Sequence, residues 1–214
     1  MSGLNKRQAE LMKEAAEWRL LGLLFECPSE KWKEELQRLA NETADPKLAE
    51  AARLAADEGA EGIYHSTFGP GGPAPAREIS YRSWAQPGYM ISELSAYYGA
   101  FGFSPKTDET PDHISVEASF VSYLKMKEAF ALASGHTGRA EITSRASEGF
   151  IRDHVSKVAE RLSRSLSRSG IGYLSKAGEI LFERVGPDPD RSGNRGFLPV
   201  ALADDESLDC GPGI

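Results

Sequence analysis

The sequence predicts an all-α, single-domain helical bundle with a long loop rich in proline and glycine and an irregular C-terminal tail. Three observations predict this fold. Apolar residues recur at spacings of three and four along most of the chain, which is the period of an α-helix. No segment shows the apolar-polar alternation of a half-buried strand. The helical pattern stops near residue 186, so we expect a domain over 1–186 and a tail rich in Gly, Pro and Asp over 187–214.

Composition excludes several classes of protein. The net charge of −7 argues against a nucleic-acid binder, because neutralising phosphates requires a basic surface. The longest apolar run near the N-terminus, Leu20–Phe25, is too short for a signal peptide or a membrane span. Cys27 and Cys210 form no CxxC or Cys/His motif, so neither a disulfide framework nor a zinc signature is present. We therefore expect a cytoplasmic protein with no cofactor, no nucleic-acid partner and no stable membrane insertion.

Three helices are expected before residue 64. The first carries one apolar stripe, made of Leu11, Ala15, Trp18, Gly22 and Phe25, and it stops before Pro28. Ser29 is expected to cap the second helix. Asp45 and Pro46 are typical of an N-cap and a first helical position, and the apolar pattern of this third helix continues towards Ile63.

The segment 64–88 changes character, because proline and glycine dominate it and predict a loop with fixed bends. Long loops inside a compact domain are usually functional or disordered. Three aromatic residues in this loop, Phe68, Tyr81 and Trp84, favour ordered packing over disorder. Its glycines do not match a phosphate-binding motif, and its prolines remove the backbone N–H groups that such a site needs.

The second half of the domain is again helical. One helix follows the loop and closes at Gly102. The next is expected to start with Thr110 as N-cap and Pro111 as first residue, and its two apolar faces predict a buried, central position. Two further helices are expected over Glu141–Ser169 and Gly172–Val185.

The start of the central helix contains the residues of greatest chemical interest. Asp112 in a first helical turn would face free backbone N–H groups and gain about 0.3–1 kcal/mol from the helix dipole. A protonated His113 gains nothing there, so it needs a buried hydrogen bond or a ligand. His113 and Glu117 also share the four-residue spacing of a ligand pair, although ExxH and HExxH patterns are absent.

The loop and this helix start together resemble the TorD/DmsD/NarJ family of maturation chaperones for molybdenum enzymes. The matching loop residues are Phe68, Gly69, Pro70, Ala74, Pro75, Glu78 and Tyr81. The matching helix residues are Glu109, Pro111, Asp112, His113, Ile114, Glu117 and Phe120. The sequence departs from the family pattern at Ala118 and Val121, where the family has leucine and methionine, and both positions stay apolar.

The resemblance implies a non-catalytic, all-α, cytoplasmic chaperone that is a monomer or a homodimer. Its implied partners are the catalytic subunit of a molybdoenzyme of the dimethyl-sulfoxide-reductase type and the N-terminal signal peptide of that subunit. A receptor for such a peptide needs carboxylates beside an apolar groove. The residues expected to bind the peptide or client are Asp112, His113, Glu117, Glu78, Tyr81, Trp84, Phe68 and Pro75.

Two other hypotheses remain open at this stage. The chain could be a helical metal-binding protein or enzyme that uses His113 and Glu117, with His65 or His154 as further candidates. Separately, the tail segment Asn194–Ala203 resembles the second half of a twin-arginine leader, so it could mimic the client peptide, act as a strap over apolar surface or be disordered.

Overall fold

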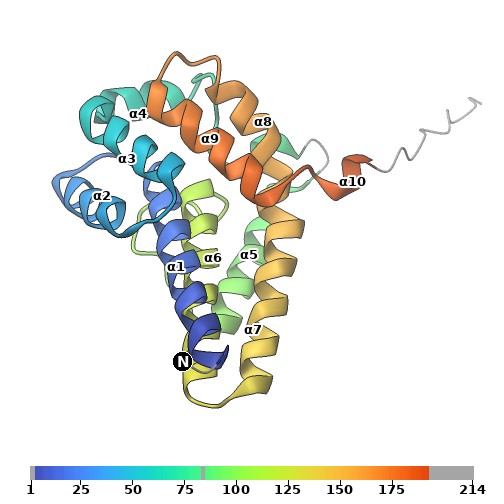
Figure 1. Ribbon diagram of the computed structural model, residues 1–214. Helices are drawn as coiled ribbons and strands as arrows, with labels where there is room; N and C mark the ends of the chain where they lie inside the picture. The colour runs from blue at the N-terminus through green and yellow to red at the C-terminus, as the bar shows by residue number, and fades with distance from the viewer. Residues whose placement is uncertain (1–2, 83–84, 193–214) are drawn as a thin grey trace, which may run out of the picture.

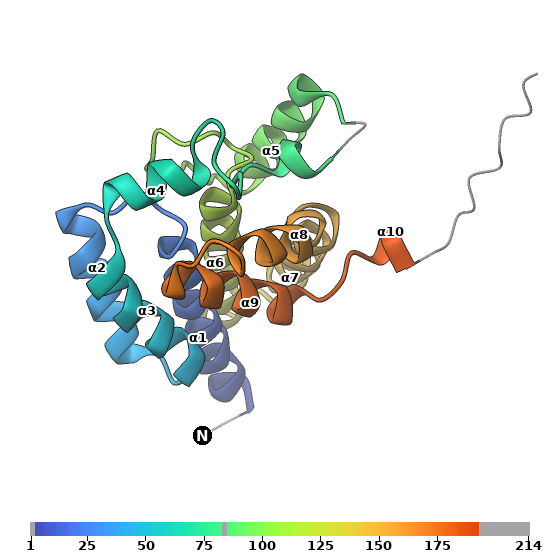
Figure 2. The same ribbon diagram turned by 90° about the horizontal axis from the view of Figure 1, so that it is seen from above.

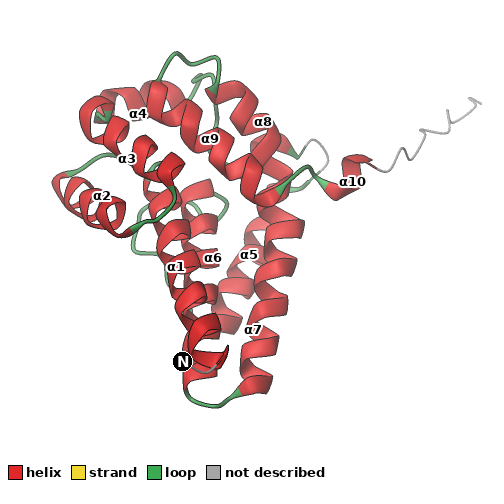
Figure 3. Ribbon diagram, viewed as in Figure 1, coloured by secondary structure: helices red, strands yellow, loops and turns green. Residues whose placement is uncertain are grey.

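Helix α6 (Ile114–Ala133) lies at the centre of the molecule and packs along α1 (Gly3–Leu23) and α7 (Thr137–Phe150) (Figure 1). The computed structural model describes residues 3–82 and 85–192. Within this part of the chain the structure is helical and contains no strand (Figure 3). Ile114, Phe120, Val121 and Leu124 of α6 are fully buried, as expected for a helix with two apolar faces. The prediction of an all-α, single-domain fold is confirmed.

The first helices begin where capping residues predict. Ser29 Oγ accepts a hydrogen bond of 3.2 Å from the Trp32 amide at the start of α2 (Glu30–Glu42). Asp45 accepts one of 2.9 Å from the Lys47 amide at the start of α3 (Pro46–Glu58). Helix α2 packs on α3, which in turn packs on α9 (Gly172–Val185) (Figure 2). The apolar faces of these helices extend the core around α6.

The prediction that the third helix runs towards Ile63 is wrong. Helix α3 stops at Glu58, and a separate helix α4 (Glu61–Phe68) follows. Gly59 adopts an extended conformation so close to Trp32 that an added Cβ would lie 2.8 Å from the indole ring. The first five residues of the expected loop are therefore helical. Ala60, the N-cap residue of α4, makes no side-chain capping bond, so no sequence signal marks this start.

The remaining part of the expected loop is ordered. After α4 the chain passes through Ala74 and Ala76, both buried, into a 3₁₀ turn over Glu78–Tyr81 and then α5 (Pro87–Phe101). Gly102 closes α5 with φ 70°, which is a left-handed conformation that favours glycine. Phe68 and Tyr81 pack against the core, as predicted for an ordered loop. Trp84 lies outside the described residues.

The expected helix over Glu141–Ser169 is two helices. Helix α7 begins earlier, at Thr137, and a π-helical turn over Ile151–Val155 separates it from α8 (Ser156–Leu166). This turn carries His154 into the core, where it is 1% exposed. Beyond α9, a short helix α10 (Pro189–Ser192) follows, and Lys157 pairs with Asp188 at 2.5 Å. Among the helices described, none combines the length and apolar character needed to span a membrane.

Candidate functional site

The two sequence motifs meet at one place, which we call the junction: residues 76–78 of the loop and residues 112–114 before and at the start of α6. The Glu78 amide donates to the Asp112 carbonyl at 2.8 Å, and the Ile114 amide donates to the Ala76 carbonyl at 2.9 Å. Arg77 and His113 thus form an isolated antiparallel bridge. The order of the motifs in the sequence therefore reflects a direct backbone contact between them.

Asp112 is fully buried and fastens the loop to the junction. Arg77 Nε donates to both carboxylate oxygens of Asp112, at 3.0 and 3.2 Å. The Ile79 amide donates to Asp112 Oδ2 at 3.4 Å, so the carboxylate caps the 3₁₀ turn. The expected role of Asp112 in the first turn of the central helix is wrong, because α6 begins at Ile114 and not at Thr110 or Pro111.

His113 is the residue that caps α6. Its Nδ1 accepts from the Ser115 amide at 3.3 Å and lies 2.7 Å from Ser115 Oγ. Because Nδ1 is an acceptor, the proton of the neutral ring resides on Nε2, which lies 3.3 Å from Tyr64 Oη. Tyr64 in turn donates to Glu109 at 2.5 Å. Burial lowers the pKa of His113 and favours this neutral form, although Glu109 and Asp112 oppose the shift. The N-cap of α6 is thus His113, and not Thr110 as expected.

Glu78 and Glu117 form a buried carboxyl pair beneath the loop, and both are fully buried. Glu78 Oε2 lies 3.0 Å from His154 Nδ1, and its Oε1 lies 3.1 Å from Arg82 Nε. Burial raises the pKa of Glu117 well above its ordinary value, and the nearby charges of Glu78 and Asp112 raise it further. Burial and the neighbouring carboxylates therefore favour the protonated form of Glu117 next to a paired Glu78.

The aromatic and proline residues of the motifs hold the loop in shape. The Phe68 ring makes edge contacts with Phe25 and His113, with centroids 6.4 and 6.5 Å apart. Tyr81 Oη donates to the Pro75 carbonyl at 2.7 Å, which closes the loop on itself. The structure thus gathers seven of the eight expected site residues in one region. Trp84, the eighth, is not among the described residues.

Several residues that complete the junction were not predicted from the sequence. Arg77 and Arg82 provide the charges that pair with the buried carboxylates. Arg161 of α8 donates to the Tyr81 carbonyl at 2.5 Å, which joins α8 to the 3₁₀ turn. The only sequence signal was the number of acidic residues in the motifs, since buried carboxylates need basic partners.

The metal-binding hypothesis for His113 and Glu117 finds no support in the geometry. His113 is engaged with Ser115 and Tyr64, and Glu117 lies next to Glu78 and Asp112. Neither residue belongs to a group of three metal-ligating side chains within the described part of the chain. The two residues therefore serve the packing of the junction.

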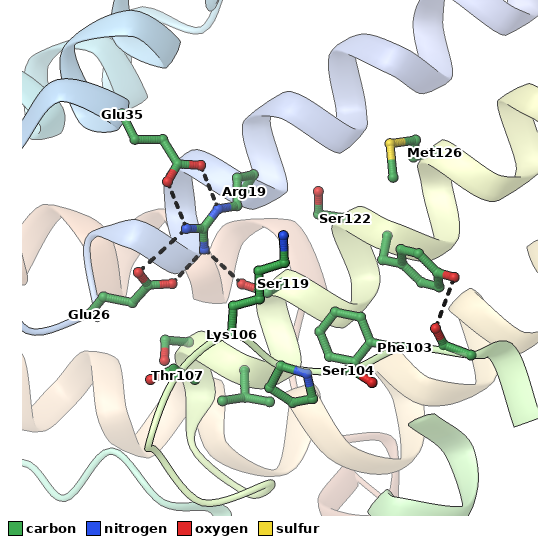
Figure 4. A pocket seen from close by; sticks show the side chains of 15 residues that line it. Arg19, Glu26, Glu35, Phe103, Ser104, Lys106, Thr107, Ser119, Ser122 and Met126 are labelled. Atoms are coloured by element: carbon green, nitrogen blue, oxygen red, sulfur yellow. Dashed lines mark hydrogen bonds and ion pairs between the residues drawn. The ribbon is translucent and has the colours of Figure 1, made fainter. Parts of the chain in front are cut away.

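An open pocket of about 680 Å³ lies beside the junction, between α1, α2, α6 and the loop 102–107 (Figure 4). Ser115 and Val116 belong both to the motif helix and to the pocket wall. The apolar part of the wall also includes Phe103, Tyr123 and Met126. This volume lies within the range of about 300–1,000 Å³ that is typical of ligand sites.

The charged side of the pocket is a cluster around Arg19. Its guanidinium binds Glu35 through two bonds of 2.9 and 3.0 Å, and it contacts Glu26 at 2.5 Å. It also donates to Ser119 Oγ at 3.0 Å (Figure 4). Burial alone would lower the pKa of Arg19, but the two carboxylates prevail and raise it. No motif signals this cluster, because its members come from three separate segments.

The helical bundle, the junction and the open pocket define an all-helical protein with an open pocket beside a fixed loop. A family model described as nitrate reductase delta subunit matches residues 29–163. The chain therefore belongs to the nitrate reductase delta subunit family, a non-catalytic family of maturation chaperones for molybdenum enzymes. This family includes the NarJ- and TorD-like proteins that the motifs resemble. No curated protein sequence matches the chain.

Proposed function

We propose that this protein is a cytoplasmic chaperone that binds the N-terminal signal peptide of a molybdenum oxidoreductase of the dimethyl-sulfoxide-reductase type. In this proposal it holds the apoenzyme during cofactor insertion and assembly, before export. Family membership supports the class of client, a redox enzyme that requires maturation. The pocket beside the junction is the observation that carries the proposed mode of binding.

The pocket has the chemistry that a signal peptide requires. Such a peptide has a basic head followed by an apolar segment, so its receptor needs carboxylates beside an apolar wall. Glu26 and Glu35 lie on one side of the pocket, and Phe103 and Met126 lie on the other (Figure 4). Val116 also lines the pocket. The two carboxylates already hold the guanidinium of Arg19. A peptide arginine would compete with Arg19 for them while the apolar segment follows the opposite wall.

The buried motif residues support binding indirectly in this proposal. Asp112, His113, Glu117 and Glu78 are at most 3% exposed, so they hold the loop and the start of α6 in place. Ser115 connects the two regions, since it contacts His113 and lines the pocket. Phe68, Pro75 and Tyr81 shape the loop on the other side of the junction. Variants of these residues should weaken binding by displacing the pocket wall.

Calorimetry of the full chain with a synthetic client signal peptide tests the proposal. Met126→Lys places a positive charge on the apolar wall, so we expect Kd to rise at least about tenfold, or about 1.4 kcal/mol. Met12→Lys is the matched control, because Met12 is 41% exposed and does not line this pocket. Equal affinities of a folded Met126→Lys variant and the wild type would exclude the pocket as the peptide site.

A further inference from the structure

A group of three metal-ligating side chains lies outside both the junction and the pocket. Cys27 follows α1, and Glu61 and His65 lie on α4. One ligand atom from each of these residues lies within 4.8 Å of the other two. Glu61 Oε1 and His65 Nε2 are 3.5 Å apart. Ligand atoms of a tetrahedral zinc ion, with bonds of about 2.0–2.3 Å, lie roughly 3.3–3.8 Å apart. Small side-chain rotations therefore suffice to form the site.

We propose that Cys27, Glu61 and His65 bind one Zn²⁺ ion and leave a fourth coordination position open. The mixed sulfur, nitrogen and oxygen donor set suits zinc, whereas Mg²⁺ and Ca²⁺ prefer oxygen donors alone. The Glu61 and His65 side chains are 74% and 62% exposed, so solvent and ions reach them freely. Three protein ligands with an open fourth position is the arrangement of exchangeable or catalytic zinc sites.

The fold holds the two contributing segments at a fixed separation. Tyr64 and Thr67 bury the inner face of α4, which leaves Glu61 and His65 together on its outer face. Phe68 at the end of α4 contacts Phe25, two residues before Cys27. On the other side, Trp32 Nε1 donates to the Leu23 carbonyl at 2.6 Å and fixes the turn that contains Cys27. A preformed site of this kind needs little reorganisation to bind an ion.

The surroundings of the site favour a cation. The negative charges of Glu61 and Glu109 both act on the Cys27 thiol. Within the described residues, Glu61 and His65 form an ion pair only with each other. Both side chains can therefore turn to a shared cation without leaving any other ion-pair partner. The network of Tyr64, Glu109 and His113 begins at the residue next to His65. A bound ion would thus stiffen α4, whose Tyr64 lies 3.3 Å from His113 of the junction.

Zinc titration of the reduced, metal-stripped full chain against a chromophoric chelator tests this site. We expect one equivalent of Zn²⁺ to bind, and Cys27→Ser and His65→Ala each to weaken binding at least about tenfold. Cobalt in place of zinc should give a thiolate-to-metal charge-transfer band that Cys27→Ser abolishes. His136→Ala is the matched histidine control, because His136 is exposed and makes no side-chain capping bond. Cys210→Ser is the matched cysteine control.

The outcomes separate the zinc site from its alternatives. Absence of competitive zinc binding, or binding that Cys27→Ser and His65→Ala leave unchanged, would overturn the proposal. Loss of binding in Cys210→Ser or His136→Ala would also overturn it, because the metal would then be held elsewhere. The zinc site does not depend on the proposed peptide function. Calorimetry with the signal peptide, repeated on Cys27→Ser, measures peptide binding without the zinc site. The zinc proposal and the peptide proposal can therefore fail separately.

Discussion

The junction and the pocket are adjacent, but their charged side chains differ in how far they are exposed to water. At the junction Asp112 and Glu78 are fully buried, and both are paired, Asp112 with Arg77 and Glu78 with His154 and Arg82. In the pocket the side chains of Arg19, Glu26 and Glu35 are 28%, 23% and 35% exposed, so water still reaches them. Buried charges are costly to leave unpaired, whereas partly exposed charges can exchange partners. The motif residues therefore maintain the structure, and the surface available to a partner lies beside them.

The largest expected effect on stability comes from His154→Ala, because His154 pairs with Glu78 of the junction. The substitution leaves Glu78 without its imidazole partner and opens space against Phe150, whose ring lies 4.9 Å from that of His154. We expect a loss of about 3–5 kcal/mol in the free energy of unfolding, measured by urea denaturation. His136→Ala on the surface should change this free energy by less than about 0.5 kcal/mol. Equal stabilities of the two variants would remove the distinction between buried and exposed sites.

Asp112→Ala should produce the next largest effect. It removes the bonds from Arg77 and from the Ile79 amide, but Arg77 is 44% exposed at its side chain and can be solvated. We expect a loss of about 1.5–3 kcal/mol, the usual contribution of hydrogen bonds to a charged group. Limited proteolysis should then cut the loop 69–82 faster. A destabilised variant with an unchanged loop cleavage rate would show that Asp112 does not fasten the loop.

Glu117→Gln tests the buried carboxyl pair through the pH dependence of stability. Because burial raises the pKa of Glu117, the folded state retains a proton that the unfolded chain releases above about pH 4.3. The stability from protonated Glu117 is complete below that pH and is lost as pH rises through the folded-state pKa. Glutamine does not titrate, so the variant should become increasingly stable relative to wild type as pH rises above about 4.3. Denaturation at several pH values measures this difference, and a pH-independent difference contradicts the assignment.

The smallest effect is expected in the pocket. Glu35→Gln weakens a partly exposed pair with Arg19, and such pairs contribute about 0.2–1 kcal/mol. The hydrogen bond from Arg19 lowers the pKa of Glu35, so its contribution is present at neutral pH and lost as pH falls. Added salt screens this pair, so it should reduce the difference in the free energy of unfolding between Glu35→Gln and the wild type. A loss as large as that of His154→Ala would mean that the pocket is as rigid as the junction.

The sequence predicted the elements that carry local signals. Ser29 and Asp45 cap helices as expected, and Gly102 closes α5. Helix α4 was missed because Ala60 provides no capping side chain, and the break between α7 and α8 was missed because a π-helical turn leaves no mark in an apolar pattern. Local signals determine where a helix can start, but long-range packing decides whether it does.

For the same reason, the residues in the two motifs were predicted, but some of their roles and the charged residues of the pocket were not. The motifs identified seven residues that the fold brings together, yet Asp112 lies before α6 and fastens the loop, and His113 takes the capping role expected of Thr110. The helix starts three residues later than expected, at Ile114 and not at Pro111, and this shift changes which side chain caps α6. Arg19, Glu26 and Glu35 were missed because α1, the turn that follows it and α2 meet only in the folded chain. His65 was named as a possible metal ligand, but its grouping with Cys27 and Glu61 was missed, because these residues meet only in the folded chain.

The backbone bridge at the junction also has a consequence for folding. The bridge joins Arg77 to His113 and so closes the loop between them. Arg77 and Asp112, which also form a salt bridge there, are 35 positions apart in the chain. Closing a loop of this size has an entropic cost that a few isolated hydrogen bonds do not offset. The bridge and the start of α6 should therefore form late and open together. In native-state hydrogen exchange, the amides of Glu78 and Ile114 should lose protection in one cooperative step, because each donates across the bridge.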